Sequence, residues 1–171
     1  MKIAIYGQSA DEISKKVFLE LLRIAKNRDV ILIIEKKYNS IISKNHTHNF
    51  ELFKSHHDLD NSIDLMITIG GDGTLLRSIT YVRNLGIPIM GINSGRLGFL
   101  ATLNQEMLNS ELDKILNEDY EIRERTLLEV SFEKKSKLSD FNYALNEVSV
   151  GRKNTTSMIE VKTILDGEYL N

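Results

Sequence analysis

Three glycines around one carboxylate, at residues 70–74, are the part of the sequence whose residue types most directly suggest chemistry. Gly71 and Gly73 have no side chain, so phosphate oxygens can approach their backbone amides closely. Asp72 stands between them, and its negative charge weakens the binding of a polyanion. We therefore expect Asp72 to have a task of its own: to accept a proton from a hydroxyl, or to hold a metal ion that bridges to phosphate.

The same residues also have a purely structural interpretation, in which they form a tight turn and Asp72 caps the following helix. Two familiar phosphate-binding motifs are excluded. The segment is not a P-loop, because no Lys-Ser or Lys-Thr pair follows at the required spacing. It is not the dinucleotide fingerprint either, because Leu76 occupies the place of the third glycine.

The elements around this turn place it at the end of a buried strand. Residues 65–69 are an apolar run that predicts such a strand. Leu75, Ile79 and Val82 then recur at helical spacing. In a parallel α/β sheet, ligands bind beyond the carboxyl ends of the strands, and a helix that begins there attracts anions with its free N–H groups. The turn is thus a predicted anion site.

Similar patterns occur on both sides of this unit. Further strands are predicted at residues 1–6, 30–34 and 87–92. Ser9 or Asp11 is expected to cap a helix that ends at Asp29, and residues 104–117 predict another helix. This alternation of strands and helices favours a mostly parallel sheet with helices on its faces.

Between these patterns, residues 36–61 are rich in Asn, Ser, His and Lys, and they contain all four histidines. No carboxylate or Cys lies at ligand spacing within a predicted element, so we expect a solvated loop and no metal site. A short apolar turn is expected near residues 50–53.

The character of the sequence changes after Tyr120. Three segments alternate between apolar and polar residues, as antiparallel strands do: residues 126–133, 143–150 and 158–165. Asp166-Gly167 is a typical two-residue hairpin turn. We therefore expect an α/β nucleotide-binding domain at residues 1–120, followed at residues 121–171 by the beginning of an antiparallel all-β C-terminal domain. So small a sheet leaves apolar faces uncovered, which suggests a truncated chain or, alternatively, cover by partner subunits.

Composition excludes several other functions. The 22 basic and 24 acidic residues give a net charge of −2, which provides no electrostatic footprint for nucleic acid or for a membrane surface. The absence of Cys excludes disulfides and cysteine nucleophiles. No apolar stretch is long enough to span a bilayer, and the N-terminus lacks the features of a signal peptide, so a cytoplasmic protein is expected.

Three segments together resemble the NAD kinase family. Residues 70–76, GGDGTLL, resemble a motif that NAD kinases share with phosphofructokinases and lipid kinases of the diacylglycerol type. Residues 91–100, GINSGRLGFL, are similar to the segment after the fourth strand of NAD kinases. Residues 144–148, ALNEV, are similar to that family's Asn-Glu motif at the start of its β domain. The family's later glycine- and threonine-rich segment is absent from the chain.

The resemblance implies phosphoryl transfer from ATP, or from polyphosphate in some bacterial members, to the 2′-hydroxyl of the adenosine ribose of NAD. A divalent ion, Mg²⁺ by expectation, would accompany ATP. Asp72 would accept the hydroxyl proton, and Gly73 would lie against the dinucleotide. The family also implies a homodimer or homotetramer.

Further side chains become candidates for binding NAD or another nucleotide. Arg77 can contact a phosphate in bidentate fashion, and Phe99 can stack near an adenine. Asn146 and Glu147 suit an adenosine, although neighbouring side chains reach one ligand only at a strand end or bulge. The full set of expected nucleotide-binding residues is Gly71, Gly73, Arg77, Asn93, Phe99, Asn146, Glu147 and Ser157.

Two other functions remain open from the sequence. The chain could belong to another kinase with the same motif, acting on a sugar phosphate or a lipid, although it shows neither an arginine-rich phosphate site nor an apolar channel. It could also be a non-catalytic nucleotide-binding fragment, because an incomplete active site supplies little of the positioning on which catalysis depends.

Overall fold

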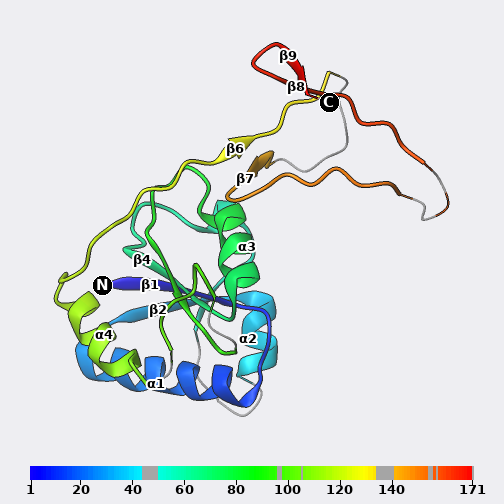
Figure 1. Ribbon diagram of the computed structural model, residues 1–171. Coiled ribbons are helices and arrows are strands. Elements are labelled where there is room, and N and C mark those ends of the chain that lie inside the picture. The colour runs from blue at the N-terminus through cyan, green and yellow to red at the C-terminus, as the bar shows by residue number, and fades with distance from the viewer. Residues whose placement is uncertain are drawn as a thin grey trace. The chain divides into compact units, whose positions relative to one another are not determined.

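The structure is a computed structural model that describes residues 1–43, 50–95, 98–104, 106–133, 141–153, 156 and 158–170. The chain divides into two compact units, Met1–Thr126 and Leu127–Asn171. Figure 1 shows helices packed around a sheet in the first unit and short strands in the second.

Five parallel strands form the centre of the first unit. They are β1 (Lys2–Gly7), β2 (Ile31–Glu35), β3 (Glu51–Phe53), β4 (Leu65–Ile69) and β5 (Ile89–Ile92). Their spatial order is β3-β2-β1-β4-β5. The chain therefore builds outward from β1 on one side and returns to build outward on the other side, so its direction of winding reverses between β1 and β4. Such a reversal opens a crevice at the carboxyl ends of the strands, where ligands bind in folds of this kind.

The strands β1, β2 and β4 are largely apolar because both faces of the sheet are covered there. Ile3 and Ile5 of β1 point into a core with α1, α2 and α4, whereas Ala4 and Tyr6 point into a second core with α3. Figure 1 shows α1 and α4 on the side of the sheet opposite to α3. All five residues of β4 are buried, as its uninterrupted apolar run predicts. The expected mostly parallel α/β fold is confirmed.

The helices begin and end largely where the sequence indicates. In α1 (Glu12–Arg28), Asp11 is the N-cap and accepts from the Ser14 N–H at 2.8 Å, and Asp29 closes the helix in the left-handed conformation. The other helices on the predicted pattern are α3 (Asp72–Val82) and α4 (Leu108–Leu116), and α4 begins four residues later than the helix expected at residues 104–117. In α4 the expected apolar stripe is buried.

Residues 36–61 differ from the expected loop. Helix α2 (Lys36–Ile42) begins at once after β2, with the buried Glu35 carboxylate accepting from the Tyr38 N–H at 2.7 Å. The predicted apolar turn is in fact the edge strand β3, and a short 3-10 helix, η1 (His56–Asp58), follows it. Tertiary packing explains the difference, because α2 and β3 are too short to show a clear pattern in the sequence, whereas Tyr38, Ile42 and Phe53 are all buried in the structure. His46 and His48 lie outside the described residues.

The second unit contains two short antiparallel pairs. Strands β6 (Leu128–Glu129) and β7 (Tyr143–Ala144) form one pair, and β8 (Thr163–Leu165) and β9 (Glu168–Leu170) form the other. The predicted hairpin turn is confirmed, since Asp166 and Gly167 join β8 to β9 with φ of 52° and 89°. Antiparallel pairing is as expected, but the strands are shorter than the alternating segments. Most described side chains of this unit are exposed.

Candidate functional site

Three glycines lie between the carboxyl end of β4 and the first turn of α3, and the fold needs glycine at only one of these positions. Gly70 has a φ of 150°, and a methyl group there would collide with the Thr74 side chain, so the fold itself requires this glycine. Gly71 and Gly73 have negative φ or extended backbone, and a methyl group at either would meet open space. Nothing within the described chain explains why these two positions are glycine. Open space before the first N–H groups of a helix is suitable for an anionic ligand.

The Asp72 carboxylate accepts three backbone hydrogen bonds from residues that lie almost thirty positions later in the chain. Oδ2 accepts from the Phe99 N–H at 2.8 Å, and Oδ1 accepts from the Leu100 and Ala101 N–H groups at 2.9 Å each. Asp72 therefore does not cap its own helix, for which Gly71 is the N-cap without a side-chain bond. Its side chain faces the segment after β5.

These hydrogen bonds lower the pKa of Asp72 below its usual value, with the Ala101 amide contributing most, because each amide stabilises the ionised carboxylate. The carboxylate is consequently charged at neutral pH. A low pKa makes a weaker base, but one that is always in the form able to accept a hydrogen bond from a hydroxyl.

Two of the expected nucleotide-binding residues are connected to Asp72 by hydrogen bonds of this segment: Phe99 directly through its N–H group, and Asn93 through Ala101. Asn93 is buried at 4% exposure; its Oδ1 accepts from the Gly95 N–H at 2.7 Å and its Nδ2 donates to the Ala101 carbonyl at 3.3 Å. The side chain of Asn93 thus holds its own segment. The Phe99 ring, in contrast, is 94% exposed, which is unusual for a large aromatic side chain.

Arg77 lies on a different side of α3 from Asp72. Five residues along an α-helix correspond to about 140° of rotation and about 7.5 Å of rise. Arg77 lines a cavity of about 570 Å³ at the carboxyl ends of β1 and β2. The cavity is lined by Tyr6, Gly7, Gln8, Glu35, Lys37, Tyr38, Ser40, Ile41, Arg77, Thr80 and Tyr81.

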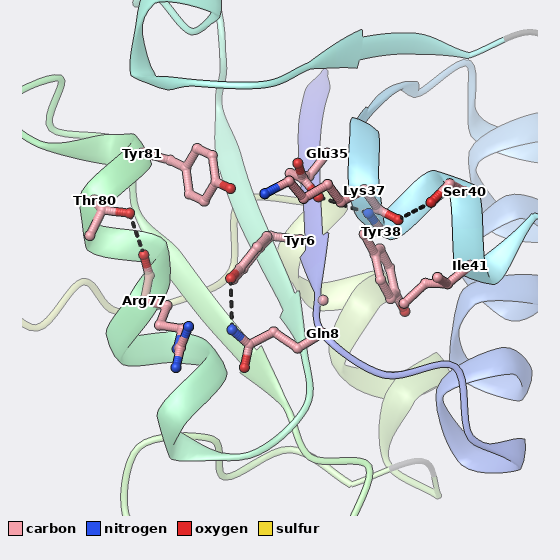
Figure 2. A pocket seen from close by; sticks show the side chains of 11 residues that line it. Tyr6, Gln8, Glu35, Lys37, Tyr38, Ser40, Ile41, Arg77, Thr80 and Tyr81 are labelled. Atoms are coloured by element: carbon pink, nitrogen blue, oxygen red, sulfur yellow. Dashed lines mark hydrogen bonds between the residues drawn. The ribbon is translucent and has the colours of Figure 1, made fainter.

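Figure 2 shows the side chains that line this cavity. Arg77 and Tyr81 lie on α3, Tyr6 lies in β1 and Gln8 just after it, and Glu35 ends β2 directly before α2. Gln8 Nε2 donates to the Tyr6 hydroxyl at 3.0 Å. Burial raises the pKa of Tyr81 to about 12 and also raises the pKa of Tyr6, so both phenols stay neutral. The cavity wall therefore combines neutral hydrogen-bonding groups with two cations, Arg77 and Lys37, and with one carboxylate, that of Glu35, which accepts from the Tyr38 N–H.

The sequence indicated only Arg77 in this cavity. Gln8 and Lys37 were missed because they follow strands whose neighbours in the sheet cannot be read from the sequence. Their one signal is position, since Gln8 directly follows β1 and Lys37 is the second residue after β2.

The remaining expected residues belong to the second unit. Asn146 and Glu147 follow the end of β7 and are exposed. Both lie past the regular strand, where neighbouring side chains need not point to opposite faces. Ser157 lies outside the described residues.

Among the described residues, no three His, Asp or Glu side chains are grouped so that they could hold a metal ion. Within those residues, no helix combines the length and the apolar character that crossing a bilayer requires.

Comparisons with known proteins identify the family of the chain. Residues 4–120 match the family of the ATP-NAD kinase N-terminal domain. The NAD kinase of Flavobacterium psychrophilum is 44% identical over 174 residues, which cover 100% of this chain and 59% of that protein. The NAD kinase of Flavobacterium johnsoniae is 41% identical over the same shares of the two chains.

A solved structure supports the fold. The crystal structure of yeast NADH kinase complexed with NADH matches 100% of this chain and 54% of its own, with a TM-score of 0.76 at 21% identity. The chain thus spans 59% of the length of the curated relatives named above.

Proposed function

Because the chain belongs to the ATP-NAD kinase family, we propose that the protein transfers a phosphoryl group from ATP to the 2′-hydroxyl of the adenosine ribose of NAD, giving NADP. One observation carries this proposal: two glycines that the fold does not require, Gly71 and Gly73, flank a carboxylate at the start of a helix. This arrangement leaves room for phosphate beside an acceptor for a hydroxyl proton.

Phosphoryl transfer depends mainly on positioning and on neutralising charge, because its transition state is loose. Asp72 would orient the ribose hydroxyl and receive its proton as the bond to phosphorus forms. The first N–H groups of α3 would contact phosphate oxygens of the ligands. The same residues would be of little use to a redox enzyme, since they include no redox-active group.

We assign the dinucleotide to the side of α3 that Asp72 faces, where the exposed ring of Phe99 offers a surface for an adenine. Asn146, Glu147 and Ser157 remain proposed NAD contacts in the second unit. Asn93 would act through the backbone that it holds.

Phe99→Ala is expected to raise the Kd for NAD about tenfold, because stacking of an aromatic side chain on a base is worth roughly 1–3 kcal/mol. Stability should be unchanged, since the ring is 94% exposed and its hydrogen bond to Asp72 comes from the backbone. Calorimetric titration with NAD measures the affinity. Phe99→Tyr keeps a ring and serves as the control; equal losses in both variants, or none in either, would contradict stacking.

We assign the phosphoryl donor to the cavity on the other side of α3. Arg77 and Lys37 supply two positive charges there against the one carboxylate of Glu35, and Tyr6, Gln8 and Tyr81 supply hydrogen-bonding groups. A volume of about 570 Å³ lies within the usual range for small-molecule sites. Groups suited to a base and ribose as well as to phosphates favour ATP over polyphosphate as the donor.

Arg77→Met is expected to raise the KM for ATP about tenfold while the KM for NAD changes less than twofold, because the guanidinium would contact only the donor. Arg77→Lys should give an intermediate value, since the charge remains but bidentate contact is lost. Steady-state kinetics with each substrate varied in turn separate the two constants. Lys16→Met, at an exposed position of α1, is the control for loss of one positive charge, and an unchanged KM for ATP in Arg77→Met would refute the assignment.

The described residues form no dedicated metal cage. Mg²⁺ would therefore arrive with ATP, held by the donor's phosphate oxygens and by water, as this ion usually is in phosphoryl-transfer sites. A homo-oligomeric state, which the family resemblance implies, and a cytoplasmic location, which the sequence analysis predicts, are further parts of the proposal.

The function is tested by incubating the purified protein with ATP, Mg²⁺ and one acceptor at a time: NAD, fructose 6-phosphate or diacylglycerol. NADP should form, and the other two acceptors should not be phosphorylated. Calorimetry with NAD, done in parallel, separates an inactive nucleotide-binding protein from one that does not bind NAD at all. Phosphorylation of the sugar phosphate or the lipid in preference to NAD would sink the proposal.

A further inference from the structure

The three hydrogen bonds to Asp72 connect two segments that are far apart in the sequence. The carboxylate comes from the first turn of α3, and its three donors are consecutive backbone amides of the segment 98–101. Consecutive amides converge on one carboxylate only when the backbone curves around it. The shape of the segment 98–101 is therefore matched to an anion at this position.

The glycine at position 98 is a second feature that allows the contact between Asp72 and the segment 98–101. A methyl group at Gly98 would collide with the Asp72 carboxylate, which is the nearest group to that position. At Gly95 a methyl group would find its nearest atom, Asn93 Oδ1, at 4.0 Å, an ordinary contact. Of these two glycines, only Gly98 is needed for the approach of Asp72.

The far end of the segment is also fixed. Ala101 is fully buried, and its backbone lies close to Gly91 of β5. A methyl group added at Gly91 would lie 2.8 Å from the Cα atom of Ala101. The Asn93 side chain donates to the Ala101 carbonyl from the other direction. The segment is thus anchored to β5 at Ala101, whereas Asp72 holds the Phe99 and Leu100 amides that extend toward solvent.

A carboxylate has about four acceptor positions, two on each oxygen. The Leu100 and Ala101 amides occupy both positions of Oδ1, and the Phe99 amide occupies one position of Oδ2. One acceptor position remains, and it is on Oδ2.

We propose that Asp72 is a positioning residue for the segment 98–101, with Gly98 providing the necessary clearance, and that the remaining acceptor position on Oδ2 is the one presented to the substrate hydroxyl. The carboxylate then has two tasks: it fixes the backbone that carries Phe99, and it offers one defined lone pair to the ligand. The second task rests on the proposed kinase function, whereas the first concerns the chain alone.

The test compares Gly98→Ala with Gly95→Ala. Gly98→Ala keeps the Asp72 carboxylate but displaces it from the amides, and Gly95→Ala adds the same methyl group to the same part of the chain without a close contact. Amide hydrogen exchange over residues 99–101, measured by mass spectrometry on the purified protein, reports the hydrogen bonds directly. We expect exchange about tenfold faster or more in Gly98→Ala, in line with the loss of charge-assisted hydrogen bonds, and unchanged exchange in Gly95→Ala.

Affinity and rate provide the second readout. Gly98→Ala should raise the Kd for NAD about tenfold and lower kcat as well, because both the Phe99 ring and Oδ2 lose their positions. Asp72→Asn should also accelerate exchange over residues 99–101, since an amide nitrogen would face at least one N–H donor. Exchange within β4 serves as an internal reference, so that a general loss of stability is recognised.

Unchanged exchange over residues 99–101 in both Gly98→Ala and Asp72→Asn would overturn the positioning role. Faster exchange with an unchanged Kd and kcat would overturn its connection to the substrate. If the protein makes no NADP at all, the kinase proposal fails while the exchange data still decide whether Asp72 holds the segment.

Discussion

Asp72→Asn is expected to lower kcat for NADP formation by about 100-fold or more, because positioned acid–base groups typically contribute factors of 10² to 10⁴. The side chain keeps its size but loses its charge, so it can no longer receive a proton. It also presents an NH₂ group to backbone N–H groups that now donate to Oδ1 and Oδ2 at 2.8–2.9 Å.

Single-turnover measurements with saturating NAD and ATP isolate this effect from binding. The wild-type rate should show no acid limb attributable to Asp72 near neutral pH, since the Ala101, Phe99 and Leu100 amides keep the pKa of this carboxyl below its usual value. A kcat in Asp72→Asn within threefold of the wild-type value would remove Asp72 as the proton acceptor.

Gly73→Ala is expected to lower kcat/KM by about 10- to 100-fold without loss of stability, because misplacement of a ligand by about 1 Å can cost a factor of 10². The added methyl group meets nothing in the protein itself. It projects into the space before α3 that the phosphates would use. Alanine is also a better helix former than glycine, by up to about 1 kcal/mol, so the free energy of unfolding should stay constant or increase.

The neighbouring Gly70 provides the opposite case and therefore the control. Gly70→Ala forces a residue with a side chain to a φ of 150° and against Thr74, so it should destabilise the protein by about 1–3 kcal/mol. Thermal unfolding and steady-state kinetics on both variants distinguish the two kinds of glycine. Full activity in Gly73→Ala would show that no ligand approaches this backbone.

The helix α3 separates two sides that would hold two substrates. Asp72 faces the segment 98–101, and Arg77 faces the cavity at the ends of β1 and β2. The first N–H groups of the helix lie between them. Transfer requires the donor's γ-phosphate and the acceptor hydroxyl to meet in line, with ADP leaving, and the two would meet at the N-terminus of α3, where negative charge is stabilised.

Local patterns in the sequence determined much of this protein's architecture. The apolar run at residues 65–69 predicted β4 with the bounds that the structure has, because a strand covered on both faces must be apolar throughout. Asp11 and Asp29 marked the ends of α1 for equally local reasons, a side-chain cap and a left-handed terminus. The three glycines around Asp72 indicated an anion site because the exposed amides of glycine and the free N–H groups of a helix start are both features of a few consecutive residues.

Only the tertiary structure decided how distant residues meet. Residues 36–61 were expected to be a loop, yet they contain α2 and β3, whose burial depends on the sheet beside them. The strand order brings Gln8, Lys37 and Arg77 to one cavity, and no local pattern relates three residues so far apart. The pairing of Asp72 with Gly98 is likewise invisible in the sequence, because a hydrogen bond and a collision depend on distance in space.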